Sequence, residues 1–423
     1  KSDDERVEAL IREYHRRGVQ NRMEVSQLLW SEHGIRMSDT TVARRRKQYG
    51  LQGSGAMTKA LSLTDKRQMV LDQMALDPTS RRGPQSIREG ILLTTGMSLT
   101  RNFVRSEMHR QDPEGFNIRE PGSKKIKRIA LVSLGPHHEW SGDGHDKLAA
   151  IGFPIWGVRD VWSGTWLGLW VVPNNRRQKA VALLFLRLIN EYGGQPLNSL
   201  MGDSGLLSSD YVGMPIQMST DCGSETTQVF GLANALREIF HPELSTEELP
   251  AHRFLRSVRN ITIERGWLAF RLQWGDNVKQ FWHAGVNVYI ESNLDHYNLI
   301  QWLWPPLIQT ELDKLRDRFN NHVIRKDSNK KNPSGVAPNI AMALPEKYGG
   351  ENCLQEVDTS IVPKLMEEIQ EGEDVLAFCT PEYSAQAQAV FDSLGIREIT
   401  FLNVWSIFSA MLPLMSTNSQ DFE

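Results

Sequence analysis

The sequence predicts an α/β protein in which a mixed sheet flanked by helices follows an all-α region and precedes a mainly helical C-terminal region. Residues 1–111 show only helix-like segments, whereas residues 131–340 alternate short strand-like segments with longer amphipathic ones. The chain has 423 residues, of which 40% are hydrophobic and 23% charged, an ordinary globular composition with enough length for two or three domains.

The first 55 residues predict three helices, the third of which is basic. The expected elements are helices over 4–17 and 23–32, a turn over 34–37, and a helix that begins after Ser38 as its N-cap. The third helix carries Arg44, Arg45 and Lys47. This spacing is typical of a helix-turn-helix domain whose second helix enters a DNA major groove. The alternative is a small helical bundle with a solvated basic face.

A second unit of the same kind is predicted over residues 56–111. The expected elements are a helix over 64–76, a helix with Pro84 in its first turn that runs to about 93, a turn over 95–97, and a helix capped by Ser98. The last helix carries Arg101, Asn102 and Arg105. Residues 112–130 predict a basic linker whose Lys124 and Lys125 lie along DNA phosphates.

Charge is distributed unevenly along the chain. The net charge is only −3, but residues 1–130 hold 25 Lys plus Arg against 16 Asp plus Glu, a balance of +9. The remaining residues hold 23 against 35, a balance of −12. A basic N-terminal third on an acidic body predicts that DNA contact begins at the N-terminal end.

The interval 131–340 predicts the α/β core. Its expected elements are strands over 138–143, 153–161, 166–172 and 215–220 and helices over 177–192, 226–240 and about 263–281. The first three strands predict an antiparallel meander. The last helix has one apolar stripe, formed by Ile263, Trp267, Phe270, Trp274, Val278 and Phe281. This order of elements is the layout of a ribonuclease H-like fold.

Three acids on separate elements of this core are candidate metal ligands. Asp143 lies on the first strand, Asp221 follows the fourth, and Glu264 lies at the edge of the apolar stripe. Mg²⁺ prefers oxygen ligands and keeps several waters, so a few converging carboxylates suffice to bind it. Two such ions can activate the attacking oxygen and neutralise the leaving oxygen of a phosphodiester. The pattern predicts phosphoryl chemistry with two Mg²⁺ or Mn²⁺ ions.

Other residues compete for these positions. Asp146 is an alternative to Asp143, and Asp203 is an alternative to Asp221, although a regular apolar strand directly precedes only Asp221. Three neighbours are expected to be structural: Asp160 as a hydrogen-bonding acid, and His145 and Cys222 as packing residues. Glu225 is expected to cap the helix that follows it. Arg259, Arg265 and Arg271 are candidate phosphate contacts, with a solvated or salt-bridged face as the alternative.

Several motifs resemble eukaryotic, fungal-type integrase core domain proteins, relatives of retroviral integrases and DDE transposases. They are WSGDGHDKL at 140–148, TDCGSET at 220–226, NITIERGW at 260–267, ELDKLRDRFNNH at 311–322 and PSGVAPN at 333–339. The resemblance covers about 136–339 and implies a ribonuclease H-like integrase core with Asp143, Asp221 and Glu264 as the catalytic and metal-binding triad. The triad spacings of 78 and 43 residues exceed those of compact retroviral integrases. No His-His-Cys-Cys zinc module precedes the core.

The resemblance implies a nuclear polynucleotidyl transferase, encoded by a transposable element, that acts in DNA integration. It implies double-stranded DNA and two Mg²⁺ or Mn²⁺ ions as partners and cofactors, a homo-oligomer of two or more chains, and room for other protein partners. One alternative is a domesticated descendant, in which catalysis is dispensable and the protein binds DNA or assembles complexes. Another is a nuclease that cuts without joining.

Cysteines and apolar runs set further expectations. Cys222, Cys353 and Cys379 are far apart, so neither a disulfide framework nor a zinc knuckle is expected, and the compartment is expected to be reducing and intracellular. No apolar run is long enough to predict a membrane span. Residues 341–423 predict a mainly helical region with helices over 363–371 and 384–394. Its apolar run over 400–413 is expected to pack on the core or on a partner chain.

Overall fold

A computed structural model describes residues 2–78, 80–112, 133–192, 211–255, 260–369 and 372–418. The chain forms two compact units, here named the helical unit and the sheet unit. The helical unit comprises Lys1–His138, Val161–Thr165 and Asp317–Cys353. The sheet unit comprises Glu139–Asp160, Trp166–Arg316 and Leu354–Glu423.

The sheet unit is built on a mixed sheet with the strand order β3-β2-β1-β5-β6. The strands are β1 (Glu139–His145), β2 (Ile155–Asp160), β3 (Trp166–Val171), β5 (Gln217–Asp221) and β6 (His252–Leu255). The first three pair antiparallel, which confirms the predicted meander, and β5 and β6 continue the sheet parallel to β1. The sequence did not predict β6, which is only four residues long and has two exposed residues.

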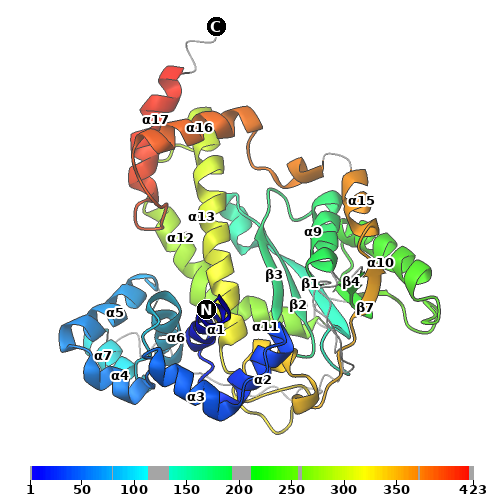
Figure 1. Ribbon diagram of the computed structural model, residues 1–423. Helices are drawn as coiled ribbons and strands as arrows, with labels where there is room; N and C mark the ends of the chain where they lie inside the picture. The colour runs from blue at the N-terminus through cyan, green and yellow to red at the C-terminus, as the bar shows by residue number, and fades with distance from the viewer. Residues whose placement is uncertain are drawn as a thin grey trace. The chain divides into compact units, whose positions relative to one another are not determined.

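Helices cover the sheet, with α9 and α10 to its right and α12 and α13 to its left in Figure 1. They are α9 (Gln178–Glu191), α10 (Thr227–Phe240), α11 (Ile261–Phe270), α12 (Asp276–His283) and α13 (Leu294–Asn321). The predicted helix over 263–281 is α11 and α12 joined by the π-helical turn η4 (Arg271–Gly275), and its apolar stripe is buried from Ile263 through Val278. This arrangement confirms the predicted ribonuclease H-like α/β core.

The α13 helix was not predicted, and Pro305 and Pro306 lie inside it. It runs along the edge strand β3, where the Gln309 side chain donates to the Leu169 carbonyl at 3.0 Å and accepts from the Val171 amide at 3.1 Å. The edge of the sheet is therefore paired with a side chain rather than left open.

The C-terminal region packs on the sheet unit. Its elements are β7 (Gln355–Asp358), which pairs with β4 (Tyr211–Met214), and the helices α15 (Ile361–Glu368), α16 (Pro381–Ser393) and α17 (Val404–Asn418). The apolar run over 400–413 enters α17, where the Trp405 indole donates to the Phe281 carbonyl at 2.8 Å and contacts the rings of Trp282 and Trp304. The sequence predicted that this run packs on the core or on a partner chain, and the structure packs it on the core.

The helical unit confirms the predicted order of N-terminal helices. They are α1 (Ser2–Arg16), α2 (Arg22–His33), α3 (Asp39–Gln48), α4 (Ser54–Ala60), α5 (Leu63–Ala75), α6 (Pro84–Thr95) and α7 (Arg101–Gln111), together with the later α14 (Pro338–Ala343). The first three helices share an apolar core with Trp162, Val336 and Ile340. Helices α5–α7 form a second core.

Two details of this unit differ from the sequence predictions. Ser38 caps α3 as predicted, but the cap of α7 is Thr100, whose hydroxyl accepts from the Phe103 amide at 3.4 Å. The predicted cap, Ser98, is buried and accepts from the Gln20 side chain at 3.2 Å. The short helix α4 was not predicted. Most of the predicted linker, including Lys124 and Lys125, lies outside the described residues.

Candidate active site

Asp143 and Asp221 are brought together by two neighbouring parallel strands. The register of β1 and β5 pairs Ser141 with Ser219, and continuing it by two residues sets Asp143 beside Asp221. Side chains two residues apart on a strand share a face, so both carboxylates lie on the face that carries the two serines. The sequence placed each acid on its strand, and the parallel pairing makes them neighbours.

Helix α11 is tied to this face by the residue that precedes it. The side chain of Asn260, the residue before α11, accepts from the Ser141 hydroxyl at 2.5 Å and donates to the Gly142 carbonyl at 3.5 Å. Asn260 is buried, so these bonds are shielded from water. They fix the start of α11 beside β1, and Glu264 follows within the first turn of the helix.

Two glycines allow α11 to lie close to the sheet. A Cβ atom on Gly157 of β2 would lie 2.6 Å from the Trp267 ring. A Cβ atom on Gly266 would lie 2.5 Å from the Trp166 ring and 2.8 Å from Arg159 Nη1. Any larger residue would push the helix outward. This close packing brings the Trp267 indole to the Asp143 carboxylate, to which its Nε1–H donates at 3.0 Å.

A ring stack fixes the orientation of the Trp267 indole. The His145 imidazole lies against it, with ring centroids 4.7 Å apart and an angle of 17° between the planes. Burial, assisted by the nearby Lys147 charge, lowers the pKa of His145 to about 4, so the ring is neutral at physiological pH. His145 therefore acts as a packing residue, as predicted.

The Asp143 carboxyl group lies in a negative environment. Burial, followed by the charges of Asp221 and Glu264, raises the pKa of Asp143 to about 7, while the Trp267 indole acts in the opposite direction. All three acids line one cleft of about 360 Å³. The structure therefore gathers the three predicted acids at one cleft and couples them electrostatically.

The donor chemistry of this cleft suits a hard divalent cation. Carboxylate oxygens are the ligands that Mg²⁺ and Mn²⁺ prefer, and clustered negative charge is relieved by a bound cation. Across the part of the chain that the structure describes, however, no group of three or more His, Cys, Asp or Glu side chains is gathered closely enough to hold a metal ion. The acids share the cleft without forming a preassembled three-ligand cage, and Glu264 is exposed.

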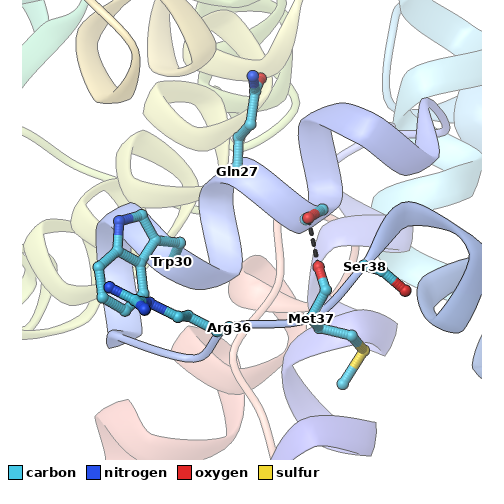
Figure 2. A pocket seen from close by; sticks show the side chains of 6 residues that line it. Gln27, Trp30, Arg36, Met37 and Ser38 are labelled. Carbon is cyan, nitrogen blue, oxygen red and sulfur yellow. Dashed lines mark hydrogen bonds between the residues drawn. The ribbon is translucent and has the colours of Figure 1, made fainter.

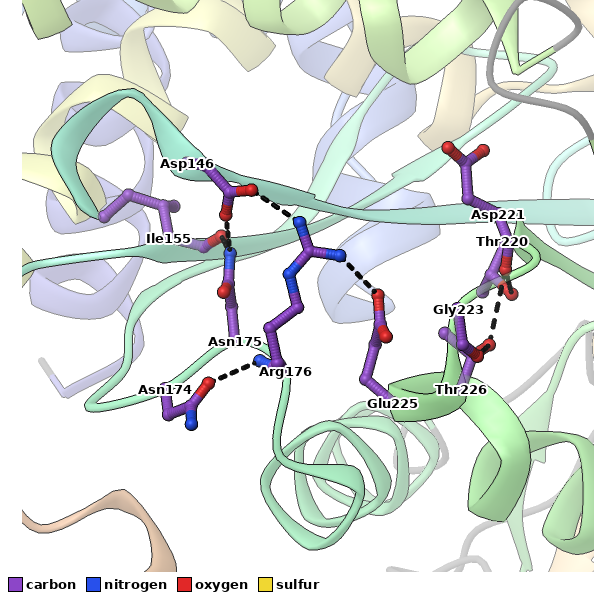
Figure 3. Close-up of polar contacts among 10 residues, drawn as sticks. All are labelled: Asp146, Ile155, Asn174, Asn175, Arg176, Thr220, Asp221, Gly223, Glu225 and Thr226. Carbon is purple, nitrogen blue, oxygen red and sulfur yellow. Dashed lines mark hydrogen bonds and ion pairs between the residues drawn. The ribbon is translucent and has the colours of Figure 1, made fainter. Parts of the chain in front are cut away.

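Asp146, the alternative to Asp143, and Glu225, the expected helix cap, share one partner. Arg176, in the segment between β3 and α9, donates to Asp146 at 2.5 Å and to Glu225 at 3.2 Å (Figure 3). The Glu225 carboxylate lies next to Gly223 and pairs with Arg176, and the N-cap residue of α10 is Thr226. Its predicted capping role is replaced by this ion pair.

The other residues considered as ligands, packing residues or phosphate contacts differ in how far they are buried. Asp160 is fully buried at the end of β2, consistent with a structural acid. Cys222 is exposed and lines the cleft between Asp221 and Gly223. Asp203 and Arg259 lie outside the described residues. Arg265 and Arg271 are half-buried on α11 and η4.

Sequence reasoning missed four residues that build this site: Asn175, Arg176, Asn260 and the indole donor of Trp267. Trp267 was predicted only as part of the apolar stripe and of the motif at 260–267, and Asn260 only as part of that motif. The signals available were the Asn174-Asn175-Arg176 run before a predicted helix and an asparagine directly ahead of the Glu264 helix. Neither signal shows which distant residues these side chains contact.

The predicted DNA-binding side chains of the helical unit lie mostly on its surface. Arg44, Lys47, Arg101, Asn102 and Arg105 are exposed. Arg45 is half-buried and donates to the Tyr49 hydroxyl at 3.3 Å. The neighbouring Arg46 turns inward and bonds the Gln20 carbonyl. The exposed basic residues thus stand on the third and seventh helices, as the sequence predicted.

A hollow of about 460 Å³ lies between α2 and the turn over 36–38 that precedes α3. Its lining includes Trp30 and Arg36, whose guanidinium lies 4.4 Å from the indole centroid, and the Ser26 hydroxyl donates to the Met37 carbonyl at 2.5 Å (Figure 2). These contacts hold the turn before Ser38 in place.

Comparison with known families matches residues 203–343 to the integrase core domain. The match includes Asp221, Glu264 and the motif at 333–339, and it begins after the strand that carries Asp143. This similarity supports a relationship with the integrase and transposase superfamily. A comparison with curated proteins finds no match. Of the helices that the structure describes, none is both long and apolar enough to span a bilayer.

Proposed function

We propose that this protein is a DDE-type polynucleotidyl transferase of the transposase and integrase kind, which binds double-stranded DNA and cleaves and joins phosphodiesters. The observation that carries the proposal is the meeting of Asp143, Asp221 and Glu264 at one cleft. The integrase core match over 203–343 supports it. We further propose that it belongs to the eukaryotic, fungal-type group and acts in the nucleus.

Asp143, Asp221 and Glu264 would hold two Mg²⁺ or Mn²⁺ ions. Such ions, when bound, activate the attacking oxygen, neutralise the leaving oxygen and offset charge on the phosphate. Burial and, after it, the charges of Asp221 and Glu264 raise the pKa of Asp143, and a bound divalent cation would offset this cost of ionising the carboxyl group. Glu264 is exposed, lines the cleft, and lies in the first turn of the helix that Asn260 anchors.

The surrounding residues orient the acids. Trp267 donates to one oxygen of Asp143 and so fixes the direction in which the other oxygen points. The His145 ring stacks on the indole, and the missing side chain of Gly157 leaves room for the indole against β2. A water molecule or a DNA 3′ hydroxyl would be the nucleophile in this cleft.

DNA would be held by the basic side chains of the helical unit. The proposed contacts are Arg44, Arg45, Lys47, Arg101, Asn102 and Arg105, with Lys124 and Lys125 of the linker and Arg265 and Arg271 near the cleft. Joining requires two DNA segments to be held together, so we expect a dimer or a higher homo-oligomer.

One observation favours a second candidate, a domesticated descendant that binds DNA or assembles complexes without catalysis. Among the described residues, no three metal-binding side chains are already gathered in a ligand cage. A protein released from catalysis would retain the fold and the acids while losing the need for such a cage.

Strand cleavage and joining on labelled duplex DNA distinguish these functions. We expect activity with Mg²⁺ or Mn²⁺ that falls on the order of 100-fold or more in Glu264→Gln, because the amide removes a charged ligand. Glu238→Gln, an exposed glutamate of α10, is the matched control and should retain activity.

The products separate the alternatives. Joined strands indicate a transferase, and cleavage without joining indicates a nuclease. Metal-dependent activity that Glu264→Gln leaves intact would contradict the proposed triad. No activity in the wild type, together with full rescue of the cellular function by Glu264→Gln, would establish the non-catalytic role.

A further inference from the structure

Arg176 connects the two loops that leave the catalytic strands. Asp146 follows β1 at the start of η1 (Asp146–Ile151), and Glu225 lies in η2 (Ser224–Thr226) after β5. The guanidinium reaches Asp146 Oδ2 through Nη2 at 2.5 Å and Glu225 Oε1 through Nη1 at 3.2 Å. Figure 3 shows Arg176 between the two carboxylates, with Asp221 beyond Glu225.

The arginine is placed by a buried anchor. The Asn175 side chain is 4% exposed, and its Nδ2 donates to Asp146 Oδ1 at 2.7 Å and to the Ile155 carbonyl at 3.4 Å. The Arg176 amide donates to the Asn174 side chain at 2.8 Å. Asn175, next to Arg176 in the chain, is therefore bound to the residue that follows β1 and to the first residue of β2, independently of the ion pairs of Arg176.

Two glycines of the predicted motifs make room for this arrangement. A Cβ atom on Gly144, next to Asp143, would lie 2.8 Å from Asn175 Nδ2. A Cβ atom on Gly223, two residues after Asp221, would lie 2.2 Å from the Glu225 carboxylate. The missing side chain of Gly144 leaves room for Asn175 near Asp143, and that of Gly223 leaves room for the Glu225 carboxylate near Asp221.

We propose that Arg176 is a positioning residue that sets the separation of Asp143 and Asp221 by bridging Asp146 and Glu225. The inference rests on the proposed function, because it takes the two aspartates as a cation-binding pair. The ion pairs themselves stabilise the folded protein little, since the Arg176 side chain is 61% exposed. Their effect is on the geometry of the two loops.

This role predicts a change in metal affinity opposite to that expected from charge alone. Removing a positive charge beside carboxylates should strengthen Mn²⁺ binding if Arg176 acts only through its field. If it sets the spacing, Arg176→Ala should weaken Mn²⁺ binding about tenfold. Arg176→Lys keeps the charge but lacks the planar fork that spans two carboxylates, so it should remain impaired.

The experiment combines Mn²⁺ titration by calorimetry with hydrogen exchange of the full-length protein in chelator. In Arg176→Ala, the amides of Gly223 and Thr226, which bond within the β5–α10 turn, should exchange faster. Arg397→Ala, an exposed arginine elsewhere in the sheet unit, is the control and should match the wild type in both measurements.

The exchange measurement separates this inference from the proposed function. Faster exchange in Arg176→Ala supports the bridge even if the wild type binds no Mn²⁺, a result that would count against the proposed function alone. Unchanged exchange, or Mn²⁺ binding that becomes tighter in Arg176→Ala, overturns the inference. Full recovery in Arg176→Lys also overturns it, because charge without the fork would then suffice.

Discussion

The helical unit and the cleft of the sheet unit use charged side chains in different ways. In α3 and α7 the selected basic residues are mostly exposed, and the partner of Arg45 lies four residues away. In the cleft, Asp143 is bonded to a residue 124 positions away and Asp146 to one 30 positions away. The basic surface follows from local sequence, whereas the acidic cleft depends on contacts between distant segments.

This difference bears on which acids are proposed to bind the cations. Of the four acids near the ends of β1 and β5, sequence favoured Asp143 and Asp221 as ligands, left Asp146 as an alternative and assigned Glu225 to a helix cap. Arg176 pairs with Asp146 and with Glu225, which also lines the cleft, and Asp143, Asp221 and Glu264 complete its acidic lining. The long-range partner thus separates the acids that brace the site from those proposed to hold the cations.

Two glycines in helices test whether the cleft depends on close packing. Gly266→Ala should destabilise the protein by about 2 kcal/mol, because its Cβ would lie 2.5 Å from the buried Trp166 ring. Gly231→Ala in α10 should instead stabilise by roughly 0.5–1 kcal/mol, since nothing lies within 4 Å and alanine favours helix. Denaturant unfolding measures both. Stabilisation by both variants would refute the packing account.

The charge of the cleft is tested by Asp143→Asn in chelator. The folded protein holds the Asp143 proton up to about pH 7, whereas the unfolded chain releases it near pH 4. Because the unfolded chain releases this proton in the window where the folded protein still holds it, wild-type stability falls progressively as pH rises from about 4 to about 7. The variant should be more stable by about 1–2 kcal/mol at pH 8, with the difference vanishing near pH 4. Unfolding curves at both pH values measure it, and a pH-independent difference would contradict the cause given.

The smallest expected effect concerns the basic surface. Arg101→Ala should weaken duplex DNA binding several-fold and reduce the slope of log affinity against log salt by about 0.9, the value for one phosphate contact. Arg397→Ala removes the same charge outside the helical unit and should leave both quantities unchanged. Fluorescence anisotropy across a salt series provides the measurement. Equal losses in the two variants would indicate a general charge effect without a defined contact.

Sequence alone predicted the elements of the fold better than their contacts. The strands at 139–145, 155–160 and 166–171 and the Ser38 cap were predictable because alternation and capping are local properties. The four-residue β6 was missed because so short a segment carries little alternation. The cap at Thr100 was placed two residues early because Ser98 and Thr100 have the same capping chemistry, and only burial distinguishes them.

The candidate site was predicted in part. Asp143, Asp221 and Glu264 were identified because each follows or lies on a predictable element, and the structure places them at one cleft. The contact of Trp267 with Asp143 could not be predicted from local sequence, because the two residues are 124 positions apart. It also depends on the close packing that Gly157 and Gly266 allow. The domain limits and the DNA contacts stay predictions.

Mn²⁺ binding by the purified protein tests the central claim most directly. Electron paramagnetic resonance of a Mn²⁺ titration should show binding by the wild type that is at least tenfold weaker in Asp221→Asn, because the amide keeps the shape of the side chain but removes a charged oxygen ligand. Glu238→Gln should bind as the wild type does. Equal Mn²⁺ affinity in Asp221→Asn and the wild type would contradict the assignment of this cleft as the cation site.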